Sequence, residues 1–291
     1  MISIIIVNYN TPDLTISCIK SIIEHVRIDF EIIVVDNHSC DDSIEKLKSN
    51  CGQEIILIES PENLGFGRAN NLGATYAKGK YLFLLNSDTV LNNDPFKWFI
   101  PFYESSSEIG AIGAYLKDGR GEYTLSGGKT FSIRKYLKIA LRGLLRKRNN
   151  KFEAPLKDEI QEVDYVIGAD LFISKNLFRK SGGFDQNIFM YFEDVELCRK
   201  LVDKGFKNYL IPGPQIVHFV KSSSTSQFAR VYNTASLMYC IRKSTSFLKF
   251  KIFQISYFLL KMPILLRLHS FKKEWEYITT IFQYKKYLTH Q

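Results

Sequence analysis

Three polar residues, Asn86, Ser87 and Asp88, directly follow a short run of apolar residues at 81–85. A run of that kind is typical of a strand that is buried on both faces of a parallel sheet. Open α/β sheets bind ligands outside the carboxyl ends of their strands, where these three side chains would lie. Oxygen ligands at that point suit Mg²⁺ or Mn²⁺, which also binds substrate phosphates. An ordinary turn is the alternative, because Asn, Ser and Asp are common turn residues.

Two further positions carry titratable side chains beside apolar segments. Glu193 and Asp194 precede helical spacing of apolar residues over 195–201, so they would begin a helix that ends near Gly205. Acids at a helix start satisfy free N–H groups and the helix dipole, and this structural role is the alternative to catalysis. His218 stands between two apolar residues, where a packed core side chain is more frequent than a metal ligand.

The elements that must position these residues alternate between strand and helix over the first 90 residues. Strands are predicted at 2–7, 31–36, 54–59 and 81–85, and helices at about 12–26, 42–47 and 68–78. This alternation with short connections predicts a parallel, doubly wound sheet that binds a nucleotide. The sequence lacks both the G-x-G-x-x-G fingerprint after its first strand and a Walker loop. We therefore expect a metal ion and side chains to hold the nucleotide.

The alternation weakens after Val90. We expect a helix at 94–104, strands at 109–116 and 206–211, and a bent strand or strand pair at 163–174. A basic amphipathic helix is predicted at 134–148, and a second basic, apolar helical segment at 247–268.

Length and composition place the chain among globular proteins. It has 291 residues, 45% hydrophobic and 24% charged, which is enough for one large domain with an appendage. The five cysteines show no C-x-x-C pair and no zinc spacing, so we interpret them as reduced thiols of a cytoplasmic protein. The amino-terminal residues do not resemble a signal peptide, because they lack a basic start and meet Pro12 early.

The net charge of +9 is concentrated in two segments, 134–148 and 236–291. A basic surface of this kind is typical of proteins that bind nucleic acid or anionic lipid. The basic residues of both segments stand among Phe, Leu and Ile, which favours lipid over nucleic acid.

A set of short motifs occurs in a fixed order along the chain. They are SIIIVNYN, EIIVVDNHS, ENLGFGRANN, FLLNSD, GAD, GGFD, YFEDVELCRK and finally His218. In this order they resemble the family 2 glycosyltransferases of the rhamnosyltransferase-like branch, over about residues 2–220. The resemblance implies a Rossmann-like, A-type glycosyltransferase domain with a mostly parallel central α/β sheet, followed here by a helical basic tail.

The resemblance also implies an activity, namely transfer of a sugar from a nucleoside diphosphate to an acceptor hydroxyl with inversion. Asp88 would be a ligand of Mg²⁺ or Mn²⁺, and His218 would be the second protein ligand. Asn86 replaces the first acid of the family's Asp-x-Asp motif, which puts direct metal ligation by Asn86 in doubt. Asp194 is expected to be the general base, with Glu193 either orienting the acceptor or acting as the base itself.

The donor pocket is expected at the ends of the first strands. Residues assigned to the nucleotide or donor are Val7, Asn8, Tyr9, Asp36, Arg68, Asn86 and Ser87, and Asp170 would lie near the donor sugar or the acceptor. Asp36 would accept a hydrogen bond from the pyrimidine N3–H, and Arg68 would reach the diphosphate. Their structural alternatives are a capped loop for Asp36 and a solvated helix residue for Arg68.

The expected domains are a catalytic domain at 1–235, with a nucleotide-sugar half to about 115 and an acceptor half beyond, and a tail at 236–291. Segment 247–268 is interrupted by lysines and Pro263, so it cannot span a bilayer, yet it is too apolar for a solvated helix. An interfacial helix on anionic lipid explains both properties. Burial against the catalytic domain or against a dimer partner is the alternative.

The sequence thus predicts a cytoplasmic glycosyltransferase that is peripheral on the inner face of the cell membrane. Its donor would be a dTDP- or UDP-sugar, with rhamnose favoured, and its acceptor a saccharide, expected to be lipid-linked, in cell-surface polysaccharide synthesis. The alternative is a non-catalytic protein of a polysaccharide assembly complex that binds a nucleotide sugar, in which Asn86 marks a lost metal site.

Overall fold

The computed structural model describes residues 1–129, 133–144, 159–219, 226–265 and 271–288. Its centre is an eight-stranded sheet in the order β3-β2-β1-β4-β10-β6-β11-β8. The strands are β1 (Ile2–Asn8), β2 (Phe30–Asp36), β3 (Ile55–Glu59), β4 (Tyr81–Asn86), β6 (Ile109–Ala114), β8 (Gln161–Val163), β10 (Asp170–Ser174) and β11 (Lys207–Ile211). Six of them point the same way, while β8 and β10 run in the opposite direction. The predicted fold class, an α/β domain with a mostly parallel sheet, is confirmed.

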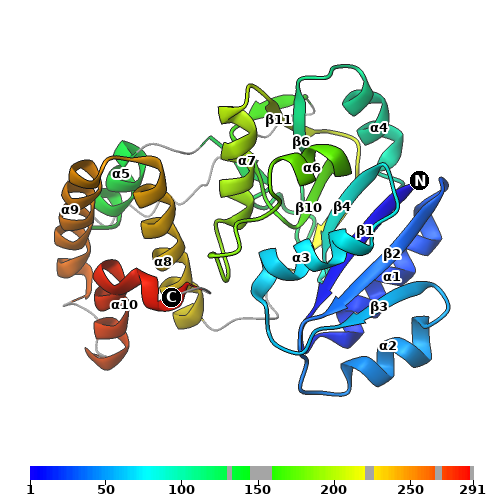
Figure 1. Cartoon of the computed structure of the whole chain (residues 1–291), viewed down its shortest axis with the longest axis horizontal. Coiled ribbons are helices and arrows are strands. Elements are labelled where there is room, and N and C mark those ends of the chain that lie inside the picture. The colour runs from blue at the N-terminus through cyan, green and yellow to red at the C-terminus, as the bar shows by residue number, and fades with distance from the viewer. Residues whose placement is uncertain (130–132, 145–158, 220–225, 266–270, 289–291) are drawn as a thin grey trace. The chain divides into compact units, whose positions relative to one another are not determined.

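The central strands are mostly apolar because helices cover both faces of the sheet (Figure 1). The helices of this part are α1 (Pro12–His25), α2 (Ser43–Cys51), α3 (Gly65–Tyr76), α4 (Phe96–Glu104), α6 (Lys175–Lys180) and α7 (Glu193–Asp203). Alternate residues of one strand belong to different cores: Phe83 packs with α1 and α4, whereas Leu82 and Leu84 pack with α6 and α7. Phe83 contacts the rings of Phe96 and Phe99 edge-on, which fixes α4 against the sheet.

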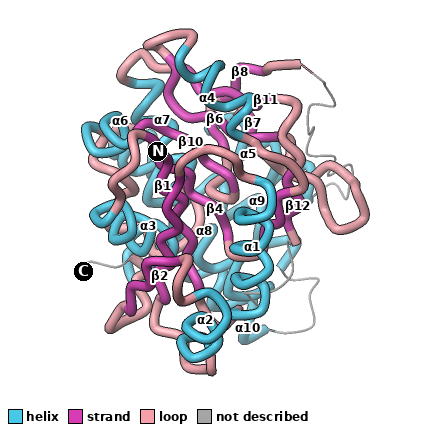
Figure 2. Tube along the Cα trace, turned by 90° about the vertical axis from the view of Figure 1, so that its right-hand side faces the viewer, coloured by secondary structure: helices cyan, strands magenta, loops and turns pink. Residues whose placement is uncertain are grey.

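The parallel strands end in register at one edge of the sheet, and Figure 2 shows β1, β2 and β4 side by side. Asn8 pairs with Asp36, and Val7 pairs with Asn86. Antiparallel β10 begins at the same edge, because Asp170 lies opposite Leu85 of β4. The residues predicted to bind the donor are therefore gathered at this edge by the topology.

Two small sheets extend this edge. β5 (Thr89–Leu91) follows the turn after β4 and pairs antiparallel with β12 (Ile216–His218). β7 (Gly127–Gly128) pairs antiparallel with β9 (Tyr165–Val166). The pairing of β5 with β12 brings residues 216–218 beside the chain that directly follows β4.

The chain divides into two compact units. One comprises residues 1–129, 153–185 and 193–223, and contains the sheet. The other comprises residues 130–152, 186–192 and 224–291. The helical unit extends before the predicted domain boundary at 235. It includes residues 130–152, 186–192 and 224–235, which were predicted to belong to the catalytic domain.

The helical unit is built from α5 (Ile133–Leu144), α8 (Ser226–Ser244), α9 (Phe247–Leu265), α10 (Phe271–Gln283) and the 3₁₀ turn η1 (Tyr284–Tyr287). The predicted helices at 134–148 and 247–268 correspond to α5 and α9, and their last residues, 145–148 and 266–268, lie outside the described part. Phe250, Phe253 and Tyr257 form the core of this unit with residues of α8 and α10. None of the helices in the described ranges combines the length and the hydropathy that a membrane span requires.

Candidate functional site

The turn after β4 brings the predicted metal ligands together. The Thr89 hydroxyl donates to the Asn86 carbonyl over 2.7 Å and closes the turn. His218 of β12 lies opposite Thr89 of β5. The backbone N–H of the following residue, Phe219, donates to the Asp88 carbonyl over 2.9 Å. As a result the His218 Nε2 lies 3.2 Å from Asp88 Oδ1 and 3.3 Å from the Asn86 Nδ2.

The polar atoms of this group do not satisfy one another. The His218 Nε2 can either donate to Asp88 or accept from Asn86, but one nitrogen cannot do both. Two further buried atoms, the Asn86 Oδ1 and the His218 Nδ1, have no hydrogen-bond partner among the described residues. The side chains of His218 and Asp88 are 12% and 15% exposed, so each keeps a small solvent-accessible surface.

This donor set fits a hexacoordinate divalent cation. Neighbouring ligands of an octahedral Mg²⁺, with bonds of about 2.1 Å, lie about 3 Å apart. The 3.2 Å between the carboxylate oxygen of Asp88 and the imidazole nitrogen of His218 is close to that spacing. No group of three or more His, Cys, Asp or Glu side chains in the described ranges could hold a metal. The protein would therefore supply two ligands and leave the others to substrate and water.

The buried thiol of Cys18 packs against this turn. The Cys18 Sγ lies 3.7 Å from the Asn86 carbonyl oxygen and 3.6 Å from the Thr89 hydroxyl. Burial raises the pKa of Cys18 to about 12, so the thiol stays neutral and serves as packing rather than as a ligand. The sequence signalled Cys18 only as one of the apolar positions of α1.

The predicted nucleotide residues Asn8 and Asp36 bind each other. The Asn8 Nδ2 donates to Asp36 Oδ1 over 2.8 Å, and the Ser39 N–H donates to Asp36 Oδ2 over 3.0 Å. The Thr15 hydroxyl donates to the Asn8 Oδ1 over 2.7 Å. Both Asn8 and Asp36 are buried, and together they tie the ends of β1 and β2. Ser39 and Thr15 belong to this network and were not identified from the sequence.

Four other predicted donor residues lie near the same strand ends or on α3. Val7 precedes Asn8 at the end of β1, and the Tyr9 side chain that follows is exposed. The Ser87 hydroxyl lies 3.3 Å from that of Thr11. Arg68, in the first turn of α3, forms an ion pair of 3.1 Å with Glu62. To contact a diphosphate, the Arg68 guanidinium would have to leave Glu62 or bind both groups at once.

The acidic pair begins α7 after a constrained entry. Tyr191 and Phe192 have positive φ angles of 67° and 69°, which non-glycine residues rarely adopt outside functional sites. Asp194 Oδ2 accepts from the Gly168 N–H over 2.9 Å, and Oδ1 accepts from the Val195 N–H over 2.7 Å. Glu193 is buried, and its Oε2 has no hydrogen-bond partner in the described part of the chain.

These surroundings affect the protonation of Glu193 and Asp194 differently. Burial raises the pKa of Glu193 well above its ordinary value, and the charge of Asp194 raises it further. Burial also raises the pKa of Asp194, but the N–H groups of Gly168 and Val195 stabilise its carboxylate and oppose the rise. The arrangement therefore favours a neutral Glu193 beside an ionised Asp194.

Asp170 is fully buried at the start of β10. Its Oδ2 accepts from the Ala114 N–H, and its Oδ1 has no partner among the described residues. A Cβ added to Gly113 would clash with the Val166 Cγ1 and lie 3.1 Å from that Oδ1, so the glycine makes room first for Val166 and also for the carboxyl. Burial raises the pKa of Asp170 to about 8. A contact of Asp170 with a sugar stays a prediction, because the side chain has no exposed surface here.

The segment Gly168–Asp170 connects the two chemical centres. The Gly168 N–H holds Asp194, and the Ala169 carbonyl accepts from the Asn86 N–H over 3.0 Å. Asn86, two residues before the predicted metal ligand Asp88, and Asp194 are thus both hydrogen-bonded to one short stretch of backbone. The GAD motif of this stretch, with Asp170 as a site residue, was identified from the sequence, but the hydrogen bonds of its backbone to Asn86 and Asp194 were not.

Comparisons with known proteins identify the family and the fold. The family model described as "Glycosyl transferase family 2" matches residues 3–177. The rhamnosyltransferase WbbL of Escherichia coli is 27% identical over 244 residues, which is 80% of this chain and 88% of that protein. The low-salt glycan biosynthesis hexosyltransferase Agl10 of Haloferax volcanii is 27% identical over 68% of this chain and 60% of its own length.

Two solved structures share the fold. They are GalNAc-T7 with UDP, GalNAc and Mn²⁺, and the mannosyltransferase PcManGT from Pyrobaculum calidifontis with GDP-Man and Mn²⁺. Both superpose with a TM-score of 0.59, at 16% and 13% identity. The matches cover 88% and 98% of this chain, and 54% and 85% of the respective neighbours. The family model matches more than half of the chain, which therefore belongs to glycosyl transferase family 2.

Proposed function

We propose that this glycosyltransferase transfers a sugar, with rhamnose favoured, from a nucleoside diphosphate to a hydroxyl of a saccharide, with inversion at the anomeric carbon. The observation that carries the proposal is the approach of the His218 Nε2 to Asp88 Oδ1 at 3.2 Å, beside the Gly168–Asp170 segment that holds Asp194. A rigid metal-ligand pair and a positioned base are the two devices that such a displacement needs.

Asp88 and His218 would hold Mg²⁺ or Mn²⁺ at the diphosphate. When bound, the cation neutralises the charge that develops on the leaving diphosphate. Asn86 would not orient the imidazole through Nε2 once the cation is bound, because the one lone pair of that nitrogen would then bind the metal. The Asn86 Oδ1, which has no partner among the described residues, would instead accept a hydrogen bond from a water on the cation. The presence of Mn²⁺ in the two structural neighbours supports this choice of metal.

The nucleotide would bind at the ends of β1 and β2. Tyr9 is exposed and offers a ring to the base, while Asn8 and Asp36 hold the two strand ends at a fixed separation. Each oxygen of Asp36 has a second lone pair, so the carboxylate can accept the pyrimidine N3–H without losing its present partners. dTDP-rhamnose or a UDP-sugar is the proposed donor, and the similarity to WbbL supports rhamnose.

Asp194 would remove the proton of the acceptor hydroxyl as the oxygen attacks the anomeric carbon. Its two backbone hydrogen bonds fix the carboxylate and leave lone pairs for the acceptor. Glu193 stays protonated beside it and limits the negative charge in the pocket. The proposed acceptor is a lipid-linked saccharide at the cytoplasmic face of the membrane, used in cell-surface polysaccharide synthesis.

The test separates metal binding from turnover. A panel of dTDP- and UDP-sugars is screened by thermal shift with and without Mn²⁺, because a bound ligand raises apparent stability. Mn²⁺ affinity is then measured by electron paramagnetic resonance, and hydrolysis of the best donor by release of the nucleoside diphosphate. Asp88→Asn should remove the Mn²⁺ effect in both assays and lower turnover about 100-fold or more. His218→Ala should weaken Mn²⁺ binding less.

The control is Asp29→Asn, which changes an exposed carboxyl of the same unit and should leave both readouts as in the wild type. If the Asp88→Asn variant, assayed with a chelator, turned over the donor as fast as the wild type does, the metal assignment would be refuted. Donor binding without any turnover by the wild-type protein, with or without saccharide acceptors, would instead support a non-catalytic role in a polysaccharide assembly complex.

A further inference from the structure

One side of α9 carries a row of exposed aliphatic side chains. They are Leu248, Ile252, Ile255 and Leu259, each at least half exposed, from 52% to 70%. Their spacing of four, three and four residues places them on a single face of the helix. On the opposite side of α9, Phe250, Phe253 and Tyr257 are buried in the core of the helical unit. The helix is therefore apolar on both sides, while its core covers only one.

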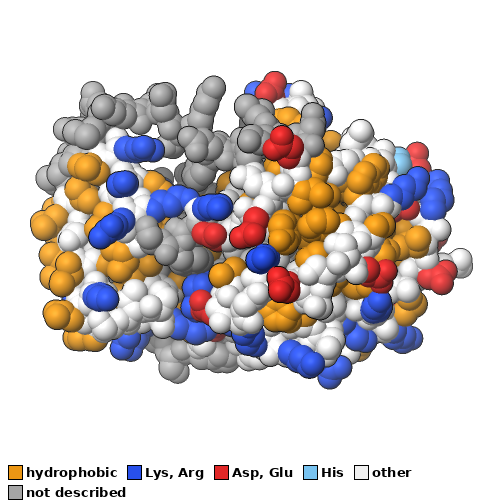
Figure 3. Space-filling model, turned by 90° about the horizontal axis from the view of Figure 1, so that it is seen from above, with side chains coloured by type: hydrophobic (Ala, Val, Ile, Leu, Met, Phe, Trp, Pro, Cys, Tyr) orange, Lys and Arg blue, Asp and Glu red, His pale blue; other side chains and the backbone are white. Residues whose placement is uncertain are grey.

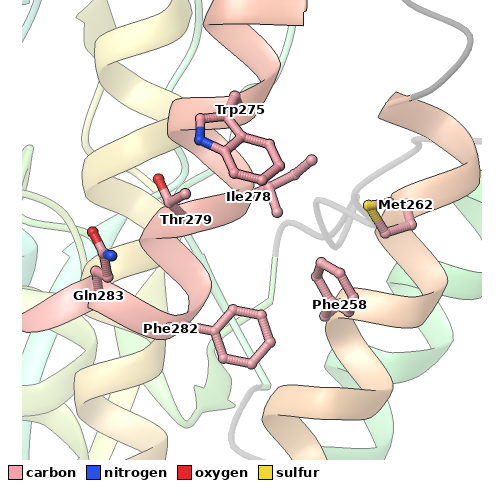
Figure 4. Close-up of a pocket in the computed structure, with 7 residues that line it drawn as sticks. All are labelled: Phe258, Met262, Trp275, Ile278, Thr279, Phe282 and Gln283. Carbon is pink, nitrogen blue, oxygen red and sulfur yellow. The ribbon is translucent and has the colours of Figure 1, made fainter.

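An apolar groove continues this face toward α10. A pocket of about 280 Å³ lies between the two helices. It is lined by Phe258 and Met262 from α9 and by Trp275, Ile278, Thr279, Phe282 and Gln283 from α10. Figure 4 shows Trp275, Ile278 and Phe282 of α10 facing Phe258 and Met262 of α9 across this opening. Trp275 and Phe282 are also about half exposed, so the apolar surface extends onto α10.

Basic side chains flank this surface. Lys249 and Lys251 are exposed on either side of the aliphatic row, and Arg242 and Lys243 are exposed at the end of α8 just before it. The sequence of α9 contains no Asp or Glu. Figure 3 shows hydrophobic and basic side chains interspersed over the helical unit. A protein interface core is normally depleted in lysine, whereas an anionic lipid surface attracts it.

We propose that this face, formed by the aliphatic row of α9 and the adjoining edge of α10, binds the surface of an anionic phospholipid bilayer. α9 lies in the plane of the interface, with its aliphatic row among the acyl chains and its lysines at the headgroups. Trp275 and Phe282 enter the same layer, in which aromatic rings are favoured. This binding depends on the helical unit and not on the chemistry of the Asp88–His218 site.

The structure also corrects which residues face the lipid. From the sequence, the apolar bulk of the interfacial helix is predicted to come from Phe250, Phe253, Tyr257, Phe258 and Leu265. The first three are 3%, 1% and 8% exposed and fill the core, whereas Phe258 lines the groove toward α10. The row that begins at Leu248 takes their place.

The proposal is tested with the full chain and vesicles, either of phosphatidylcholine alone or with 30% phosphatidylglycerol. The wild type should float with the anionic vesicles at low salt and bind the neutral ones much less. Ile252→Glu/Leu259→Glu should reduce the partition coefficient about 100-fold, because two apolar anchors become anions. Lys249→Gln/Lys251→Gln should reduce it about fivefold per lysine and flatten the dependence on salt.

The matched control is Ile23→Glu/Val202→Glu, which adds the same two charges at exposed apolar positions of the sheet-containing unit. This variant should bind vesicles nearly as the wild type does. Equal partition of the Ile252→Glu/Leu259→Glu variant and the wild type would overturn the proposal. So would a wild-type dimer that ignores vesicles and becomes monomeric in that variant, since a second copy would then cover the face. Donor hydrolysis, measured without vesicles, should be unchanged by the variant and reports on the proposed reaction separately.

Discussion

Asp170→Asn should make the protein more stable at neutral pH, by an amount that depends on pH. The carboxyl is fully buried, with one oxygen bonded to the Ala114 N–H, and its pKa is raised from 3.8 to about 8. Between these two values the unfolded chain has lost the proton while the folded chain retains it. The free energy of unfolding therefore falls as pH rises through this window, by about 1.4 kcal/mol per pH unit. It is highest below pH 4 and levels off above pH 8.

The asparagine variant cannot titrate, so the wild type and the variant should diverge as pH rises. From pH 5 to pH 7 the variant should gain about 2.7 kcal/mol relative to the wild type. The raised pKa values of Glu193 and Asp194 act in the same direction, but they are present in both proteins and cancel. An amide can accept from the Ala114 N–H as the acid does, so the local structure should be kept.

The assay uses the two tryptophans, which report on different units. Trp98 lies in α4 of the sheet-containing unit, and Trp275 lies in α10 of the helical unit. In a Trp275→Phe background, urea unfolding followed by fluorescence reports on the unit that contains Asp170. A control, Asp29→Asn, alters an exposed carboxyl and should shift stability by less than about 0.5 kcal/mol at both pH values. A constant difference between Asp170→Asn and the wild type from pH 5 to pH 7 would show that the buried carboxyl is ionised.

Two further predictions concern the base and the helical core. Asp194→Asn should lower turnover by about three orders of magnitude without changing donor affinity. Glu193→Gln resembles the protonated acid and should lower turnover far less. An active Asp194→Asn variant together with an inactive Glu193→Gln variant would reverse the assignment. Because the base must lose its proton and its pKa is raised, wild-type turnover should rise with pH along an acidic limb above pH 4, as a pH–rate profile checks. Phe253→Ala should destabilise the helical unit by about 3–5 kcal/mol through the cavity it leaves, measured by Trp275 fluorescence in a Trp98→Phe background, and a loss below 1 kcal/mol would contradict the core assignment.

Local signals in the sequence were sufficient for the parallel half of the sheet. Four apolar runs predicted β1 to β4, and Pro12 marked the start of α1, which ends one residue before the expected Val26. Such elements can be read from sequence because burial on both faces leaves a continuous apolar run and a helix start has its own residue preferences.

The long-range pairings could not be read in this way. Nothing local places antiparallel β10 between β4 and β6, and it is this insertion that buries Asp170. The approach of His218 to Asp88 depends on the pairing of β12 with β5, and only the family resemblance suggested it. In α9, apolar residues occur on all sides, so the pattern could not tell the core face from the exposed face.

The pairing of β5 with β12 has a consequence for the order in which the enzyme matures during synthesis. Asn86 and the histidine that it contacts are 132 residues apart, so the ribosome makes them on the order of 10 s apart. Through that interval the nascent chain carries the ends of β1, β2 and β4 without the imidazole that completes the proposed metal pair. Competence to bind the metal therefore arrives with β12, the last strand of the chain to be made in the described ranges. An unfinished chain would lack this ligand and with it the proposed means of activating a nucleotide sugar.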